Sequence, residues 1–326
     1  MDCRGAGCLG KKMARELVTV LMPVRDTRAS MLQTAIDSIR AQTFRDFEFL
    51  MVDDGSERPE TRECLARAAA QDPRVRLERT GGIGVTRALN LGLRFARGGL
   101  IARQDADDWS EPRRLALQID FLAAHPGAVL CGTAAWRHRR DGAPLWIARM
   151  PCSHPEILRA LETGNPFFHG SAIFRRGAAL GMGGYRDEFS CSQDYDFFCR
   201  LSEAGTVANL AEPLYHYRHD SGSVSALGAG AQHRAHRAAR ILAGARRRGE
   251  VEDVTRALEA AGEFPSLARL KQADHFLLAG DYRGAWKAYW RALTRNPWSA
   301  LAWGKMARCA LFAAVPATRA LTFGAG

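Results

Sequence analysis

Three carboxylates that lie close together in the sequence are well suited to chemistry. Asp105, Asp107 and Asp108 follow the apolar run 99–102, which is typical of a short buried strand. Side chains alternate between the two faces of a strand, so Asp105 and Asp107 are expected on the same side. Neighbouring carboxylates repel each other unless a cation lies between them, and Mg²⁺ or Mn²⁺ prefers oxygen ligands and substrate phosphates. The spacing indicates a cation that holds a diphosphate, although Asp-rich strand ends also serve as solvated turns or helix caps.

The elements that must position these residues alternate between strand and helix patterns. Strands are predicted at 17–22, 47–52, 75–78 and 99–102, with helices at 30–42, 61–71 and 85–96. This alternation predicts a parallel sheet with helices on both faces. A helix at 112–124, a strand at 128–132 and a hairpin within 133–149 are expected next.

Other candidate ligand-binding residues follow the predicted strands, at the edge where such sheets bind ligands. Arg25-Asp26 ends the first strand, and Asp53-Asp54 ends the second. The glycine loop 81–84 precedes a helix and would present amides and Arg87 to a phosphate. No Gly-Lys-Ser/Thr follows this loop, and no Gly-x-Gly-x-x-Gly follows the first strand. The pattern therefore argues against a P-loop and against a dinucleotide-binding dehydrogenase.

Residues 18–225 resemble the family 2 glycosyltransferases with the GT-A fold, an α/β fold whose Rossmann-like, mixed but mostly parallel sheet is flanked by helices. The resemblance rests on five motifs in the family's order: Val20–Asp26, Ser38–Phe44 with Phe47-Glu48, Val52–Ser56, Gly84–Asn90 and Ile101–Asp108. It implies an inverting enzyme that uses Mg²⁺ or Mn²⁺ and a nucleotide-diphosphate sugar, with UDP-sugars favoured. The implied acceptor is a hydroxyl of a glycan or of a lipid-linked molecule, in bacterial cell-surface polysaccharide synthesis.

The resemblance also implies roles for individual residues. Contacts to the nucleotide sugar are implied for Pro23, Val24, Arg25, Asp26, Asp53, Asp54, Arg87 and Asp105. Contacts to the metal are implied for Asp107, Asp105 and His219, with His216 as the less favoured alternative to His219. His219 lies in a Tyr-Arg-His loop that is one residue shorter than the family pattern. His169 and Gln193 fall on the acceptor side, although a lone His near aromatic residues is as often structural.

Asp194 is the candidate general base. It falls in the first turn of a helix whose apolar face carries Tyr195, Phe198 and Leu201. A carboxylate at that place is favourable as a cap as well, with no chemistry required. The family resemblance favours chemistry, because the family keeps a Glu-Asp pair here. The amide of Gln193 cannot accept a proton in that role, so Asp194 alone is predicted as the base.

The last hundred residues are basic and helical. Residues 226–326 hold sixteen Lys and Arg against seven Asp and Glu, in a chain of net charge +11. Helices are predicted at 232–242 and 251–261, and residues 267–297 resemble a tetratricopeptide helix pair. The charge fits peripheral contact with an anionic membrane surface, whereas a nucleic-acid partner is not expected without a readout motif. A lipid headgroup layer and a helical core account equally well for the spacing of Trp286, Trp290, Trp298 and Trp303.

The chain is thus divided into residues 1–15, predicted to be disordered or a mis-assigned start, a GT-A domain at 16–225 and a basic helical extension at 226–326. No run of 18 apolar residues and no secretory leader is visible, and the eight cysteines form no Cys-x-x-Cys pair. A cytoplasmic protein, with the inner membrane face as an option, is expected. Two other functions stay open. A sugar nucleotidyltransferase would need a different first loop, and a degenerate scaffold would explain Gln193 and the spacing at His219.

Overall fold

The computed structural model describes residues 17–220, 229–262, 265–295 and 297–314. The expectation for residues 1–15 and the predicted boundary at residue 225 lie outside these ranges.

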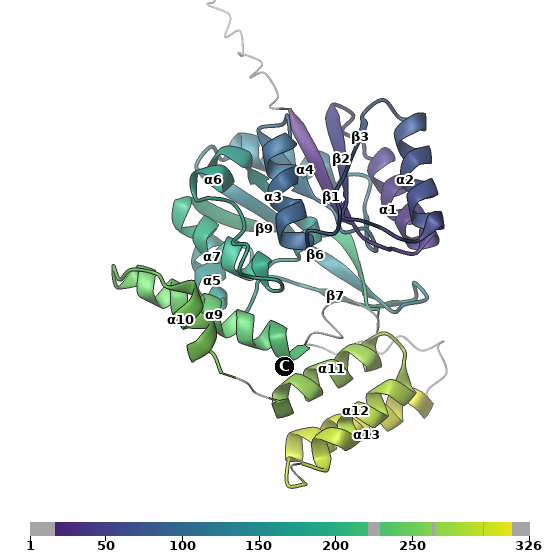
Figure 1. Ribbon diagram of the computed structural model, residues 1–326, viewed down its shortest axis with the longest axis vertical. Coiled ribbons are helices and arrows are strands. Elements are labelled where there is room, and N and C mark those ends of the chain that lie inside the picture. Colours follow the sequence, from purple (N-terminus) through teal and green to yellow (C-terminus); the bar gives the residue numbers. More distant parts are fainter. Residues whose placement is uncertain (1–16, 221–228, 263–264, 296, 315–326) are drawn as a thin grey trace, which may run out of the picture.

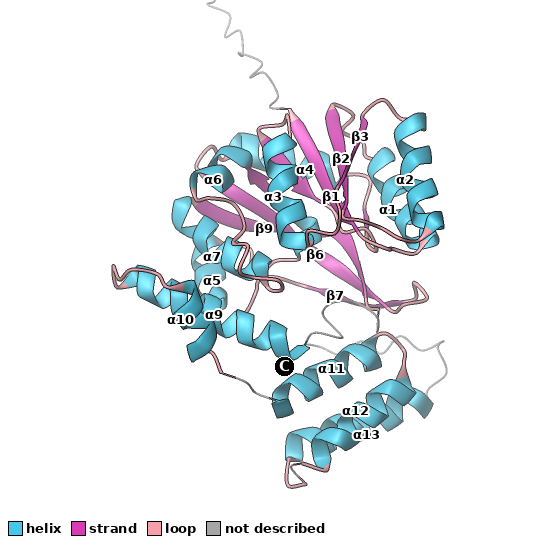
Figure 2. Ribbon diagram, in the orientation of Figure 1, coloured by secondary structure: helices cyan, strands magenta, loops and turns pink. Residues whose placement is uncertain are grey.

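A mixed sheet forms the centre of the molecule (Figures 1 and 2). Its strands in the described residues are β1 (Val18–Val24), β2 (Phe47–Asp53), β3 (Val75–Arg79), β4 (Leu100–Arg103), β5 (Trp109–Ser110), β6 (Ala128–His138), β7 (Pro144–Ala148), β8 (Ile173–Arg175) and β9 (Thr206–Arg218). They lie in the order β3-β2-β1-β4-β8-β6-β9-β5, and β7 pairs with β6. The pairs β3–β2, β2–β1, β1–β4 and β6–β9 are parallel. The prediction of a mixed, mostly parallel sheet flanked by helices is confirmed.

Helices cover both faces of this sheet. Those before residue 221 are α1 (Ala29–Arg40), α2 (Pro59–Gln71), α3 (Val85–Phe95), α4 (Arg114–Ala124), α5 (His154–Leu161), α6 (Arg176–Gly181) and α7 (Gln193–Ala204), with a 3₁₀ turn, η1 (His169–Ser171). Alternate residues of β1 face opposite cores. Val20 packs in the core that contains α1, α2 and α4, and Leu21 packs in the core that contains α3, α5 and α7.

The first strand extends further than its sequence suggested. Pro23 was expected to end the strand at Met22, yet β1 continues to Val24 and pairs with β2 as far as Asp53. Strand β4 pairs with β1 only up to Leu21. Beyond that point β1 has a free edge on the β4 side, where a proline that lacks an N–H group is tolerated.

The region after residue 228 consists of two parts rather than one extension. Its described helices are α9 (Ala229–Arg247), α10 (Val254–Ala260), α11 (Pro265–Leu278), α12 (Tyr282–Leu293) and α13 (Ala300–Ala314). Ala238 and Leu242 of α9 and Ala257 of α10 belong to the same core as α3 and α7. Helices α11, α12 and α13 share a separate core. The apolar faces of α9 and α10 are thus buried against the sheet domain, and the expected division of the chain at residue 225 stays a prediction.

The hairpin expected within 133–149 is formed by β6 and β7, whose turn contains Gly142 with φ 88°. Helices α11 and α12 form the helix pair expected at 267–297, and its assignment to the tetratricopeptide repeats stays a prediction. Among the described residues, no helix is long and apolar enough to cross a membrane.

Candidate active site

The register of the parallel strands brings three polar strand ends to one edge of the sheet. Val24 of β1 lies beside Asp53 of β2, and Leu21 lies beside Arg103 of β4. The loops that begin after these residues carry Asp26, Asp54 and Asp105. The carboxylates predicted from three separate motifs thus leave the sheet in the same direction.

Asp107 is a partly buried carboxylate whose negative charge is only partly offset by neighbouring side chains in the described residues. It is half-buried, and among the described residues no other side chain donates a hydrogen bond to it. Burial, together with the nearby charge of Asp105, raises the pKa of Asp107 to about 6. Asp108 differs: its carboxylate accepts the hydroxyl of Tyr215 at 2.9 Å and the amide of Arg218 at 2.7 Å. Asp108 therefore links β9 to this loop through two hydrogen bonds.

The donor set fits a hard divalent cation. Within the part of the chain that the structure describes, no three His, Cys, Asp or Glu side chains are gathered to hold an ion. Mg²⁺ is normally held by one or two carboxylates together with substrate phosphates. The pair Asp107 and Asp105, with its mutual repulsion, meets that requirement when a diphosphate supplies the remaining oxygens.

The metal contact implied for His219 stays a prediction, and the structure shows other contacts of this side chain. It is buried, and its Nε2 accepts a hydrogen bond from Arg137 at 3.2 Å. Burial and the adjacent charge of Arg137 lower the pKa of His219 to about 2, so the ring is neutral. Its ring lies 6.3 Å from that of Trp146 and 6.3 Å from that of His275 on α11. His219 thus lies between Trp146 of β7 and His275 of α11.

Arg103 is a site residue that the sequence analysis missed. Its side chain is 1% exposed and its guanidinium donates to Asp105 at 2.8 Å, to His169 at 3.2 Å and to the carbonyl of Leu21. It therefore joins β1, β4 and η1 at the carboxylate cluster. A charged residue at the end of the apolar run 100–102 was the signal that could have revealed it.

Gly170 allows η1 to approach the same cluster. A Cβ atom at this position would lie 1.8 Å from the hydroxyl of Tyr215 and 2.7 Å from Oδ2 of Asp105. The residue beside it is His169, whose Nε2 accepts from the guanidinium of Arg103 at 3.2 Å and from the hydroxyl of Tyr185 at 2.8 Å. Burial, with the charge of Arg103, holds the pKa of His169 well below its usual value. His169 is thus a neutral part of the site wall, and its contact with an acceptor stays a prediction.

Asp194 lies in the first turn of α7, near enough to Asp105 and Arg103 for their charges to act on it. Burial raises the pKa of Asp194 to about 6, and the charge of Asp105 contributes to the shift. Oδ2 of Asp194 accepts a hydrogen bond from the amide of Asn165 at 2.8 Å. Sequence reasoning missed Asn165, and no local pattern marks it. Gln193 begins α7 and is half-buried, and its acceptor role also stays a prediction.

The turn that delivers Asp194 is held in an unusual conformation. Ser192 has φ 52° and Asp26 has φ 48°, and these are the two non-glycine residues with positive φ in the described chain. Both directly adjoin predicted site residues, where backbone strain is often retained for function. The hydroxyl of Ser192 donates to the carbonyl of Gln232 at 3.2 Å, so α9 supports this turn.

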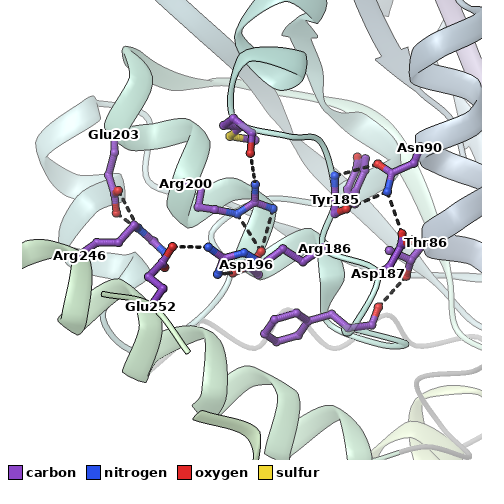
Figure 3. Close-up of polar contacts among 12 residues, drawn as sticks. Thr86, Asn90, Tyr185, Arg186, Asp187, Asp196, Arg200, Glu203, Arg246 and Glu252 are labelled. Atoms are coloured by element: carbon purple, nitrogen blue, oxygen red, sulfur yellow. Dashed lines mark hydrogen bonds and ion pairs between the residues drawn. The ribbon is translucent and has the colours of Figure 1, made fainter. Parts of the chain in front are cut away.

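A chain of ion pairs fixes α7 behind Asp194 (Figure 3). Asp196 is buried and accepts from Arg200 at 2.9 Å and from Arg186 at 3.1 Å. Arg186 also pairs with Glu252, which pairs with Arg246 on α9. Arg246 in turn donates to Glu203 at the end of α7 at 2.8 Å. The helix that carries Asp194 is therefore clamped at both ends by charged contacts to its neighbours.

The carboxylates predicted to bind the nucleotide are engaged in ordering their own loops. Asp54 accepts the amides of Ile83 at 2.7 Å and Gly84 at 2.9 Å, and so fixes the glycine loop at the start of α3. Asp26 accepts the amides of Glu57 at 2.7 Å and Arg58 at 2.9 Å. The bond from Arg58 is the main reason that the pKa of Asp26 is lowered.

The other residues predicted to bind the nucleotide differ in burial and in the partners that they already contact. Asp53 is buried and accepts the amide of Ser56 at 2.9 Å. Arg25 is exposed and lies 3.9 Å from Asp54, and Arg87 is exposed and lies 3.4 Å from Asp187. Exposed guanidinium groups such as these are free to meet a phosphate. Pro23 and Val24 form the end of β1, and direct nucleotide contacts remain a prediction for all of these residues.

The sequence model described as glycosyl transferase family 2 matches residues 19–181. The chain is 33% identical over 223 residues to the O-antigen biosynthesis protein RfbC of Myxococcus xanthus, which is 66% of this chain and 17% of that protein. It is 30% identical over 195 residues to the amylovoran biosynthesis glycosyltransferase AmsE of Erwinia amylovora, which is 60% of this chain and 73% of AmsE. The chain thus spans less than a fifth of RfbC and most of AmsE.

Two solved structures share the fold. The mannosyltransferase PcManGT of Pyrobaculum calidifontis, in complex with GDP-Man and Mn²⁺, aligns with a TM-score of 0.54 and 21% identity over 92% of this chain and 81% of that one. TarS residues 1–349 of S. aureus, in complex with UDP-GlcNAc, aligns with a TM-score of 0.58 and 15% identity over 85% of this chain and 80% of that one. At these identities the likeness establishes the fold, and it confirms the GT-A architecture.

Proposed function

Because the chain belongs to glycosyl transferase family 2, we propose that it moves a sugar from a nucleotide-diphosphate sugar to an acceptor hydroxyl during the synthesis of a bacterial surface polysaccharide. The names of RfbC and AmsE, which refer to O-antigen and amylovoran biosynthesis, support this context. The bound GDP-Man and UDP-GlcNAc of the two structural neighbours support the donor class. A UDP-sugar remains the favoured donor, and a glycan or lipid-linked molecule the favoured acceptor.

One observation carries the proposal: Asp105 lies close enough to both Asp107 and Asp194 to raise the pKa of each. This proximity supports a single site that combines a carboxylate suited to a metal with a carboxylate suited to proton transfer. Asp194 lies beyond the matched residues 19–181, so its support comes from this geometry and from the motif around it.

Asp194 acts as the general base in this proposal. At neutral pH its carboxylate is ionised, and a pKa of about 6 makes it a stronger base than an ordinary aspartate. One carboxylate oxygen takes the proton of the acceptor hydroxyl while the acceptor oxygen forms a bond to the anomeric carbon. The bond from that carbon to the diphosphate breaks, and the nucleoside diphosphate leaves with the electron pair. A single displacement of this kind inverts the anomeric centre.

Asp107 and Asp105 would hold Mg²⁺ or Mn²⁺, which when bound offsets the negative charge on the departing diphosphate. The Mn²⁺ in the PcManGT structure supports this choice of ion. Arg25 and Arg87 add exposed positive charge at the same edge of the sheet. The hydrogen bond from Asn165 to Oδ2 orients the Asp194 carboxylate.

The variant Asp194→Asn tests the proposed base. Loss of a general base typically lowers the rate about 10²–10⁴-fold, so the variant should lose transfer to that extent. Donor affinity, measured by calorimetry with UDP- and GDP-sugars and Mn²⁺, should change little. Asp120→Asn, which alters an exposed carboxylate on α4 in the same way, serves as the matched control. Full transfer activity in Asp194→Asn would remove Asp194 from the mechanism.

A further inference from the structure

The last two described helices and the turn between them expose four tryptophan side chains that lie outside the helical core. Ala285, Ala288, Tyr289 and Ala292 turn the inner face of α12 toward α11 and α13. The tryptophans lie outside that core, with exposed fractions of 44% for Trp286, 52% for Trp290, 93% for Trp298 and 48% for Trp303. The choice that sequence spacing left open, between core and surface, is therefore decided in favour of the surface.

Positive charge accompanies these tryptophans in the sequence, although one of the cations, Lys305, is paired with Asp274 of α11. Residues 282–314 contain six Lys and Arg and no Asp or Glu. Arg283, Lys287 and Arg291 recur every four residues, so they form a stripe along α12 beside Trp286 and Trp290. These three cations are exposed, and none of them takes part in an ion pair within the described residues. We call the four tryptophans together with these three cations the tryptophan–arginine face.

The position of this face leaves it open to a large partner. Helices α12 and α13 lie at an outer end of the molecule, with α11 between them and α9 (Figure 1). The turn between them is ordered by its own contacts, because the indole of Trp303 donates to the carbonyl of Pro297 at 2.8 Å. Asp281 caps α12 by accepting the amide of Gly284 at 2.8 Å. The exposed indoles are thus presented on a folded surface.

We propose that the tryptophan–arginine face docks the protein on an anionic membrane surface. Indole rings favour the boundary between lipid headgroups and acyl chains, and Lys and Arg near that boundary are attracted to acidic lipids. A second copy of the chain is a poor partner, because two faces of the same positive charge repel each other. Protein interfaces are also depleted in Lys, whereas interfacial amphipathic helices combine Trp with Lys and Arg.

This inference goes beyond the transferase activity and does not require it. Docking would keep an acceptor that is carried in the membrane close to the enzyme, but binding to vesicles is measured without donor or acceptor. A protein that binds vesicles and transfers no sugar would contradict only the proposed function. A protein that transfers sugar and ignores vesicles would contradict only the docking.

The experiment is co-sedimentation of the full chain with sucrose-loaded vesicles. Neutral vesicles of phosphatidylcholine are compared with vesicles that contain phosphatidylglycerol, at low and at high NaCl. The wild-type chain should bind the anionic vesicles at least about ten-fold more strongly than the neutral ones. High salt should weaken this binding, because it shortens the range of the electrostatic attraction.

Two double variants test whether the vesicles bind at the tryptophan–arginine face. Lys287→Glu with Arg291→Glu, and separately Trp290→Ala with Trp298→Ala, should each lower binding to anionic vesicles at least about ten-fold. The matched control is Arg234→Glu with Arg240→Glu, which makes the same change of charge on exposed positions of α9. All of these side chains are exposed, so the melting temperature should stay within a few degrees of the wild type, which confirms folding.

Three outcomes would overturn the proposal. The first is wild-type binding that is absent or equal for neutral and anionic vesicles. The second is an equal loss in the α9 control and the α12 variant, which would mean that overall charge alone acts. The third is a wild-type dimer, detected by light scattering, that becomes a monomer in Trp290→Ala with Trp298→Ala, because the face would then bind a second copy.

Discussion

At the scale of single residues, burial separates the carboxylates into those that order loops and those that remain reactive. Asp26 and Asp54 receive backbone amides, and Asp108 receives a tyrosine hydroxyl and an amide. Among the described residues, no side chain donates to Asp107, whereas the side-chain amide of Asn165 donates to Asp194. Burial raises the pKa of these two aspartates to about 6, and it also raises the pKa of Asp108 well above its usual value despite the two donors of that carboxylate.

The pH dependence of transfer should report the ionisation of Asp194. Since the base must be ionised, the rate should fall as pH drops through about 6. The bond from Asn165 favours the ionised form, so Asn165→Ala should move the acidic limb of the rate profile upward by roughly one pH unit. Thr163→Ala, on the same loop and exposed, should leave the limb unchanged. An unshifted limb in Asn165→Ala would separate this hydrogen bond from catalysis.

When no cation is bound, the ionised side chain of Asp107 should lower the free energy of unfolding. Its pKa in the folded protein lies above that in the unfolded chain, so the ionised form costs stability above pH 6 and nothing below pH 4. At pH 7.5, Asp107→Asn should raise the free energy of unfolding by about 1–2 kcal/mol, a gain that disappears by pH 4. Mn²⁺ should raise the melting temperature of the wild type more than that of the variant.

Asp72 serves as a control for this measurement of unfolding free energy, because its pKa is shifted in the direction opposite to that of Asp107. Hydrogen bonds from Arg74 are the main reason that the pKa of Asp72 is lowered, so its ionised form stabilises the fold. Asp72→Asn should therefore lose stability at pH 7.5, and the loss should vanish as pH falls below about 4. If Asp107→Asn destabilises the protein at pH 7.5 in the same way, the view of Asp107 as an uncompensated carboxylate is wrong.

At the scale of elements, the site depends on a close approach of η1 to the end of β4. The space around Gly170 is filled by Tyr215 and Asp105, so a methyl group at this position must displace one of them. Gly170→Ala should cost about 1–3 kcal/mol of stability and lower the affinity for a nucleotide sugar with Mn²⁺. Gly164→Ala is the matched control, because nothing lies within 4 Å of its Cβ position. Equal effects in both variants would show that packing at Gly170 is unimportant.

The helix that carries Asp194 illustrates how elements distant in sequence support the site. Ser192 is held by α9, and Asp196 is linked through Arg186 and Glu252 to Arg246. Since a buried carboxylate that loses its partners is costly, these contacts make α9 a structural support of the helix that carries the proposed base.

At the scale of the whole molecule, the apolar cores divide the chain after α10. Helices α9 and α10 share the core of the sheet domain, whereas α11–α13 have their own. A chain that ends at residue 262 should keep a cooperative melting transition and sugar transfer. A chain that ends at residue 225 should fail to fold, because it exposes the surface that Ala238 and Leu242 cover. Circular dichroism and transfer assays on the two truncations test this division, and loss of folding in the longer one would refute it.

The sequence by itself determined the family, the parallel half of the sheet and the polar strand ends. These features depend on short-range patterns: apolar runs, helical periodicity, and Asp or Gly at strand ends. Asp105, Asp107 and Asp194 were identifiable because each belongs to a local motif. Tertiary structure alone decided that Arg103 joins Asp105 to His169, that Asn165 holds Asp194, and that His219 faces α11. It also decided that the tryptophans of α12 lie on the surface. The reason is physical: partners that are tens of residues apart meet only through packing, which no local pattern encodes.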